Sequence, residues 1–256
     1  MWFHHATNGI NNTYLYRKYN KMKRIGLNIN QLKLIAAVSM LLDHVGYFLF
    51  PTVTVLRIIG RLAFPIFAFC ISEGCRYTKN RLRYWLQMLV CAAVFQVVAF
   101  IAEGALAPIN IFGTFSVAIL LCYLFDFIKS RKTGGFLLFG LAVFAVYALN
   151  RYLNFDYGFL GMLLPLSAYV FEATRSTDSD YASSVGRWAK FLCFSLTLLA
   201  LAGLSGWSVQ YFSIFAVPIL SLYNGQYGSK KFKYWFYVFY PFHLVVIYFV
   251  GTLIKS

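Results

Sequence analysis

The chain has 256 residues, of which 60% are hydrophobic, 20% are aromatic and only 12% are charged, and its mean hydropathy is +0.65. So few polar residues cannot cover a water-soluble globule of this length, which excludes an ordinary soluble domain. The net charge of +15 does not indicate a nucleic-acid partner, because the basic residues fall in short clusters between apolar runs and form no single face. The five cysteines lie inside apolar stretches, so neither a disulfide framework nor a metal site is expected.

The first segment, residues 1–30, has no apolar period and no signal-peptide core. It is expected to be a disordered, basic cytoplasmic tail. Met22 opens a sequence that looks like a natural start, so the residues before it are expected to be an upstream extension. No function is assigned to this tail.

From residue 31 to residue 256 the chain is a succession of apolar runs, each about 16 to 22 residues long and close to the length that a bilayer core requires. This pattern predicts an all-α, polytopic membrane helix bundle whose principal partner is the lipid bilayer. About nine transmembrane helices are expected, at about 31–50, 56–75, 84–102, 109–128, 135–150, 157–173, 188–204, 207–222 and 234–254. The turn between the seventh and eighth spans is very short. If these two spans formed one re-entrant hairpin, the C-terminus would stay on the same side of the membrane.

The basic residues predict the orientation of this bundle. If the loops are counted alternately, 19 of the 23 Lys and Arg residues fall on one side of the membrane. Because basic residues concentrate on the cytoplasmic side, the N-terminus is predicted to be cytoplasmic and the C-terminus external. The same bias accounts for the net charge without any partner.

Ionisable residues inside the predicted spans are costly in hydrocarbon and therefore mark candidate sites. Asp43 and His44 lie well inside the first span, and Arg57 and Arg61 lie near the outer end of the second. A rise of about 1.5 Å per residue puts His44 and Arg61 at similar depth. Arg57 and Arg61, four residues apart, share one helix face and can point together at an anion or at Asp43. We expect Asp43 to hold an arginine while His44 faces a cavity.

A structural interpretation of the same cluster stays open. In that interpretation Asp43 and the arginines form a buried ion pair that fixes helix packing, and a backbone carbonyl satisfies His44.

The last predicted span contains a second candidate site around Tyr240, Pro241 and His243. A proline inside a helix frees the carbonyl four residues before it, and interrupted membrane helices are tolerated mainly where they line a cavity or pack on protein. His243 is expected near the depth of His44, with Tyr240 on the same helix face. The alternative is a proline kink flanked by interfacial aromatic residues.

Weaker signals lie at the ends of other spans. Asn110 and Thr114 can donate hydrogen bonds into the same cavity, or Asn110 can serve only as a helix cap. Glu73 and Arg76, with the basic loop that follows, can receive a phosphorylated cofactor from the cytoplasm, although such loops more often serve only to orient the protein.

Several blocks of this sequence together resemble the TraX family, and the resemblance runs from about residue 31 to the C-terminus. They are Leu32-Lys-Leu-Ile-Ala-Ala-Val-Ser-Met-Leu-Leu-Asp-His-Val-Gly46, Leu56-Arg-Ile-Ile-Gly-Arg-Leu-Ala-Phe-Pro-Ile-Phe-Ala-Phe69, Glu73-Gly74, Thr78-Lys-Asn-Arg81, Asn110-Ile-Phe-Gly-Thr114, Asp156-Tyr-Gly-Phe-Leu-Gly161, Asn224-Gly225 and Phe239-Tyr-Pro-Phe-His-Leu244.

The resemblance implies a multi-pass protein of the bacterial inner membrane that is linked to N-terminal acetylation of conjugative pilin. It also implies distant kinship with membrane acyltransferases such as heparan-α-glucosaminide N-acetyltransferase. Those enzymes move an acetyl group from cytosolic acetyl-CoA to an acceptor across the membrane. By this analogy His44 is the general base, Arg57 or Arg61 stabilises charge on the acyl oxygen, and His243 and Tyr240 are supporting or alternative acid–base groups.

Two other classes of function stay open. In a transporter or channel the same polar groups would line a solute or proton path, and in a non-catalytic membrane assembly partner they would be structural. No internal repeat of the transporter type is evident. Acetyl-CoA binding from the cytoplasmic side distinguishes the acyltransferase from both, and the acceptor, a peptide N-terminus or a glycan, is left undecided.

Overall fold

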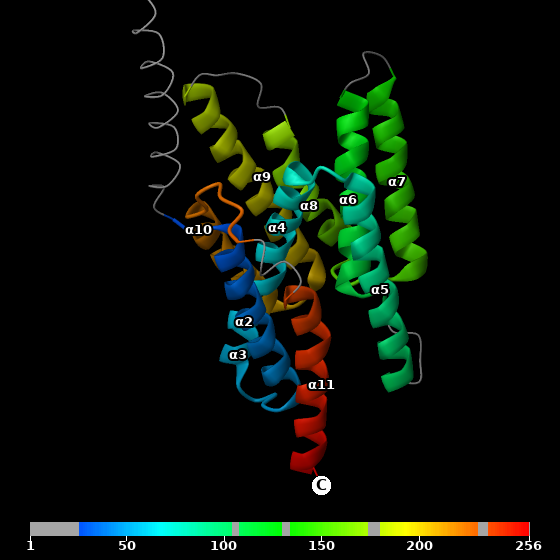
Figure 1. The fold of residues 1–256 in the computed structure, drawn as a ribbon, viewed down its shortest axis with the longest axis vertical. Coiled ribbons are helices and arrows are strands. Elements are labelled where there is room, and N and C mark those ends of the chain that lie inside the picture. The colour runs from blue at the N-terminus through cyan, green and yellow to red at the C-terminus, as the bar shows by residue number, and fades with distance from the viewer. Residues whose placement is uncertain (1–25, 104–107, 130–133, 174–179, 230–234, 256) are drawn as a thin grey trace, which may run out of the picture.

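A computed structural model describes residues 26–103, 108–129, 134–173, 180–229 and 235–255, and these residues form a helix bundle with no β-strand among them (Figure 1). Most of the helices run along the long axis of the molecule. In chain order they are α2 (Ile29–Phe48), α3 (Thr54–Gly60), α4 (Ala63–Tyr77), α5 (Arg81–Glu103), α6 (Ile111–Lys129), α7 (Gly135–Leu153), α8 (Gly158–Ala173), α9 (Asp180–Ser205), the 3₁₀ helix η1 (Ser208–Phe215), α10 (Ala216–Ser221) and α11 (Trp235–Lys255).

The expected all-helical architecture is confirmed, and each predicted span corresponds to a helical segment at nearly the predicted position. Four of these segments are long and apolar enough to cross a membrane, among the residues described: Thr54–Tyr77, Ile111–Lys129, Gly135–Leu153 and Gly186–Ser205. The predicted tail up to residue 25 and several of the basic clusters lie outside the described residues. The number of membrane crossings and the orientation therefore stay predictions.

Two of the predicted spans are interrupted in the structure. The span predicted at 56–75 consists of two helices, α3 and α4, which meet at Arg61 and Leu62. Pro65 explains this break, because proline has no N–H for the carbonyl of residue 61 and its ring collides with that carbonyl in a continuous helix. The span predicted at 207–222 is also interrupted, since a 3₁₀ helix occupies its first half.

The start of α2 is fixed by its own cap and by contacts with the far end of the chain. The Asn28 side chain accepts a hydrogen bond from the Gln31 backbone N–H, and the Gln31 side chain accepts one from Asn28 N, which forms a capping box. The Leu27 N–H donates to the Leu222 carbonyl at 2.8 Å, just after α10. α2 therefore begins two residues earlier than predicted and lies beside α10.

α4 is the central helix of the bundle and contacts α2, α6, α8 and α10. It is buried from Ala63 to Cys75 except at the half-buried Phe67, and its Phe69 is completely buried against Phe194 of α9. α2 and α3 pack together beside α4, and α11 lies along α2 (Figure 1). These four helices bring the candidate polar residues of the first, second and last spans to one place.

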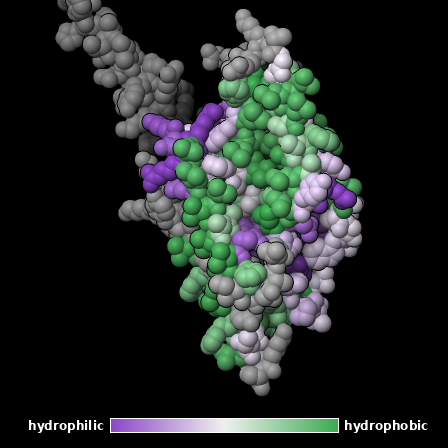
Figure 2. Space-filling model, turned by 90° about the vertical axis from the view of Figure 1, so that its right-hand side faces the viewer, coloured by the Kyte–Doolittle hydropathy of each residue, from purple (hydrophilic) through white to green (hydrophobic). Residues whose placement is uncertain are grey.

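The outer surface of the bundle is apolar. α7 lies at its edge and buries none of its apolar window inside the protein; Phe136, for example, is 88% exposed. Figure 2 shows a face covered mainly by hydrophobic residues, with the hydrophilic ones gathered in a few patches. An exposed apolar surface of this extent is the expected boundary with lipid tails, which supports a membrane protein.

Candidate functional site

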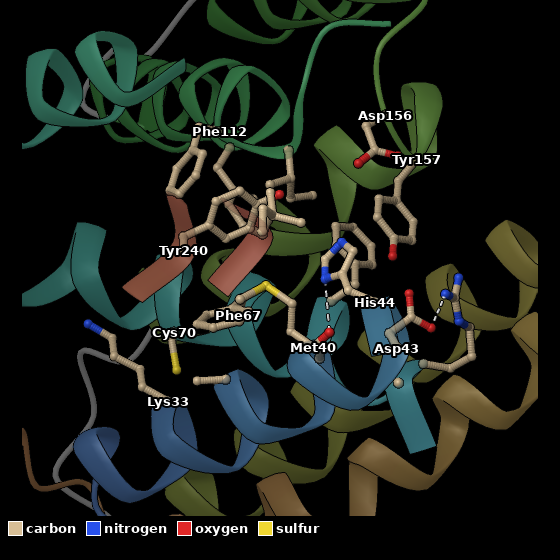
Figure 3. Close-up of a pocket in the computed structure, with 18 of the residues that line it drawn as sticks. Lys33, Met40, Asp43, His44, Phe67, Cys70, Phe112, Asp156, Tyr157 and Tyr240 are labelled. Carbon is tan, nitrogen blue, oxygen red and sulfur yellow. Dashed lines mark hydrogen bonds and ion pairs between the residues drawn. The ribbon is translucent and has the colours of Figure 1, made fainter. Parts of the chain in front are cut away.

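A cavity of about 640 Å³ lies between α2, α3, α4, α5, α6, α11, η1 and the segment before α8. Its lining along α2 runs from Lys33 to Phe48, a distance of about 22 Å at 1.5 Å per residue. Figure 3 shows Lys33 and Cys70 at one end of this cavity and Asp156 and Tyr157 at the other. The cavity therefore extends through about two thirds of the thickness of a 30 Å hydrocarbon core, and its volume is in the range of small-molecule sites.

Asp43 is the centre of an ion-pair cluster in the cavity wall. Its Oδ2 lies 2.8 Å from Arg57 Nη1 and its Oδ1 lies 2.5 Å from Arg61 Nη2. Arg57 Nη1 also donates to the Asp43 main-chain carbonyl at 3.1 Å. The predicted pairing of Asp43 with an arginine of the next span is thus confirmed, and it involves both arginines. No hydrogen bond joins Asp43 to His44 among the described side chains, as expected for adjacent residues of one helix.

Aromatic and amide groups complete the surroundings of the two guanidinium groups. The Trp207 ring lies 4.9 Å from the Arg57 guanidinium carbon and 4.7 Å from that of Arg61. Arg61 Nη1 donates to Gln210 Oε1 at 3.2 Å. Because a guanidinium stacks on an aromatic face and binds carboxylate and amide oxygens through a rigid fork, each of these contacts limits its rotation. The cluster is preorganised.

His44 and His243 meet between α2 and α11. His243 Nε2 lies 3.1 Å from His44 Nδ1, and His243 Nδ1 lies 3.0 Å from the Phe239 carbonyl. A carbonyl only accepts, so the neutral His243 ring carries its proton on Nδ1 and accepts at Nε2. His44 Nδ1, 2.9 Å from the Met40 carbonyl, must then carry the proton of its ring and share it between the two acceptors.

This assignment leaves His44 Nε2 with a free lone pair. The atom has no hydrogen-bond partner among the described residues, and His44 lines the cavity. Figure 3 shows the second ring nitrogen of His44 on the side away from Met40. Both expectations for His44 are therefore met in part, since a backbone carbonyl holds one nitrogen while the other is available as a base.

Tyr240 lines the same cavity. Its ring is edge-on to Phe95, Phe112 and His243, with centroid distances of 4.7, 4.7 and 5.5 Å. The structure thus brings together all six residues expected to carry chemistry: Asp43, His44, Arg57, Arg61, Tyr240 and His243.

Glu73 and Arg76, expected near a cofactor, do not line the cavity. The Glu73 side chain is completely buried, with Oε1 3.0 Å from Lys190 Nζ and Oε2 3.1 Å from the Tyr223 hydroxyl and 3.6 Å from Arg76 Nη1. A carboxylate with these three neighbours serves packing between α4, α9 and the segment after α10. The structure offers Glu73 no surface for a nucleotide, and the cofactor role of Arg76 stays a prediction.

Asn110 and Thr114 do not line the cavity either. Asn110 Oδ1 accepts from the Phe112 backbone N–H at 3.1 Å, and its Nδ2 donates to the Ala92 carbonyl at 2.8 Å. The buried Thr114 hydroxyl donates to the Asp156 carbonyl at 2.7 Å. Asn110 therefore caps α6, which was the alternative interpretation, and Thr114 fixes the loop before α8.

Several polar residues of the cavity were missed by the sequence analysis: Lys33, Asp156, Tyr157, Trp207 and Gln210. The Asp156-Tyr157 pair was noted only as part of a family block. Gln210 had a usable signal, because it is an amide inside an apolar run, whereas a Trp at the end of a span gives the same signal as an interfacial anchor.

Comparison with known proteins identifies a matching protein family. The sequence profile of the TraX protein family matches residues 28–251. The chain is also similar to an uncharacterized protein of Rickettsia prowazekii (strain Madrid E), with 28% identity over 142 residues, which are 54% of each chain. The matched region thus spans about half the length of that curated relative. No solved structure matches the chain.

Proposed function

The chain belongs to the TraX protein family, and from this membership and the geometry of the cavity we propose that it is an integral membrane acyltransferase. Its donor substrate is acetyl-CoA, which enters from the cytoplasm, and its acceptor is an amine or hydroxyl group, on a peptide N-terminus or a glycan, that reaches the cavity from the other side. The observation that carries the proposal is the position of His44 in the cavity wall, with Nδ1 held by the Met40 carbonyl and His243, an arrangement that leaves Nε2 as the basic nitrogen.

His44 supplies the base that such a transfer requires. Its Nε2 removes a proton from the acceptor while the acceptor nitrogen or oxygen forms a bond to the thioester carbonyl carbon. The carbon–sulfur bond then breaks, and the CoA thiolate takes the proton from the His44 imidazolium. His243 accepts a hydrogen bond from His44 Nδ1–H, so it holds the tautomer in which Nε2 is basic and stabilises the imidazolium that forms.

The charged cluster beside His44 suits the electrostatic part of the reaction. Arg57 and Arg61 are held by Asp43 and lie under Trp207. Fixed donors near a developing negative charge stabilise a transition state without having to reorganise. Lys33, at the other end of the cavity, is suited to a phosphate group of coenzyme A, whose long pantetheine arm can then extend along α2 toward His44.

The proposed topology follows the same arrangement. Nine crossings with a cytoplasmic N-terminus in the bacterial inner membrane put the Lys33 end of the cavity on the cytoplasmic side. The least regular crossing, η1 with α10, has eight 3₁₀ and six α-helical residues, which together extend about 25 Å and nearly match a hydrocarbon core. The basic residues between the segments support the orientation.

The experiment that tests this function is acetyl-CoA turnover by the purified protein in nanodiscs. CoA release and transfer of labelled acetyl to a membrane extract are followed for the unaltered protein, for His44→Ala, and for Tyr152→Phe as a control on the exposed edge of α7. We expect His44→Ala to lower kcat by about 10² to 10⁴ and the control to match the unaltered protein. If acetyl-CoA neither binds nor turns over with acceptors present, the transporter or assembly function replaces this proposal.

A further inference from the structure

The amide of Gln210 has a fixed orientation. Arg61 Nη1 lies 3.2 Å from Gln210 Oε1, and because a guanidinium has donors only, the oxygen of the amide must face it. The Nε2 group of Gln210 therefore points away from Arg61. The residue is only 3% exposed, so the surrounding protein holds the amide in this position.

Gln210 Nε2 has no hydrogen-bond partner in the described structure although it is buried. Buried donors without a partner are rare in proteins, and each one calls for an explanation. Gln210 also lines the cavity that holds His44. An unused N–H donor in the wall of a substrate cavity is an arrangement that a bound oxygen atom can complete.

We propose that Gln210 is a catalytic residue that donates a hydrogen bond from Nε2 to the carbonyl oxygen of the acyl thioester. The proposal rests on the acyltransferase function and assigns one group in it. When the acceptor attacks the carbonyl carbon, the electron pair of the C=O bond moves to oxygen, and Gln210 Nε2 stabilises that oxyanion. The pair returns to carbon as the carbon–sulfur bond breaks. Gln210 itself neither gains nor loses a proton.

The surroundings of Gln210 suit this role better than a role in substrate capture. Its amide is neutral and held by Arg61, which Asp43 and Trp207 hold in turn. A neutral, immobilised donor gives little binding energy to a ground-state carbonyl and more to an oxyanion, which carries the full charge. Loss of Gln210 should therefore lower kcat and leave KM for acetyl-CoA almost unchanged.

The test compares Gln210→Glu, Gln210→Leu and Ser213→Ala. Gln210→Glu keeps the side-chain shape and an oxygen for Arg61 but replaces the donor by a second oxygen, so we expect it to fold. Ser213 is the matched control, because its hydroxyl is also buried without a partner on η1 but does not line the cavity. We expect both Gln210 variants to lose about 10² to 10³ in kcat at constant KM for acetyl-CoA, and Ser213→Ala to keep its kcat.

Two results would overturn this inference while leaving the acyltransferase function intact. One is a Gln210→Glu protein with nearly normal kcat, and the other is a loss confined to KM of the acceptor, which would place the bound oxygen on the acceptor. Absence of turnover by the unaltered protein would remove the function and this inference together.

Discussion

His44 Nδ1 of α2 and His243 Nε2 of α11 lie 3.1 Å apart, although 199 residues separate them in the sequence. Each ring is also anchored to a carbonyl of its own helix, four residues earlier. The two anchors fix both ring planes and both tautomers, so the contact determines where the free lone pair of His44 points. In the proposed mechanism α11 therefore acts on His44 through a single hydrogen bond.

Substitution of His243 should reduce turnover without abolishing it. In His243→Ala, His44 keeps its bond to Met40 but loses the acceptor that favours protonation at Nδ1, so we expect kcat to fall by about 10- to 100-fold, less than in His44→Ala. His243→Gln should recover part of the loss, because the amide oxygen can accept from Nδ1–H. The measurement is the pH profile of kcat in nanodiscs.

The double variant His44→Ala, His243→Ala checks the mechanism of this effect. Residues that act as a unit are not additive, so its kcat should equal that of His44→Ala. Additive losses would show that His243 contributes independently of His44.

Removal of the Asp43 carboxylate should destabilise the protein. Asp43→Ala leaves two guanidinium groups, Arg57 and Arg61, largely buried without their counter-ion. Breaking a buried pair in this way costs about 3–5 kcal/mol of unfolding free energy. Thermal unfolding in detergent measures the change, with Tyr152→Ala, an exposed position of α7, as the control. A loss below about 1 kcal/mol would contradict the buried ion pair.

The Asp43 cluster was accessible to sequence reasoning because helix rise is nearly constant. Counting residues put Asp43, His44 and Arg61 at one depth, and the side chains do meet there. The position of Gln210 in the cavity wall could not be predicted by counting residues. Its face depends on a 3₁₀ helix, whose period differs from that of an α-helix, and on a turn after Ser205 that no apolar pattern specifies.

The buried position of Glu73 could not be predicted from the sequence, for a different physical reason. A carboxylate beside a basic loop gives the same sequence signal whether it faces water or is buried. Here Glu73 is buried because it pairs with Lys190, which is 117 residues away in the sequence. Pairing between distant spans requires the packing of the bundle. Pro65, by contrast, was a local signal for the break between α3 and α4 that the hydropathy of the segment concealed.

The Glu73–Lys190 pair should contribute to folding and not to acetyl-CoA binding. Glu73→Gln leaves a buried ammonium group and should cost about 3–5 kcal/mol of unfolding free energy. Adding Lys190→Met should restore much of that stability, since the double variant no longer buries the ammonium group. Unfolding in detergent and KM for acetyl-CoA are measured on both proteins. A raised KM in the stable double variant would instead support the cofactor role first expected of Glu73.

Gly60 should tolerate no larger residue. A Cβ atom at this position would collide with the Asp43 side chain, so Gly60→Ala must displace Asp43 or separate α2 from α3. We expect a loss of about 1–3 kcal/mol in unfolding free energy together with reduced turnover. Gly140→Ala is the matched control, because its Cβ would meet no atom within 4 Å; alanine there should stabilise α7 by up to about 1 kcal/mol. Equal effects of the two substitutions would refute the close approach at Gly60.

The proposed topology predicts which positions a membrane-impermeant maleimide reaches from outside the cell. After replacement of the five native cysteines, single cysteines are placed at Lys79 after α4, at Tyr152 near the end of α7, and at Ser256. With a cytoplasmic N-terminus and nine crossings, Tyr152→Cys and Ser256→Cys should react in intact cells, and Lys79→Cys only after permeabilisation. Protection of Ser256→Cys with labelling of Tyr152→Cys would mean an odd number of crossings after α7 and would contradict the nine-helix topology, whereas a re-entrant hairpin of α9, η1 and α10 would leave both positions accessible. The Lys33 end of the cavity would keep its cytoplasmic position in that case, because α2 precedes the hairpin.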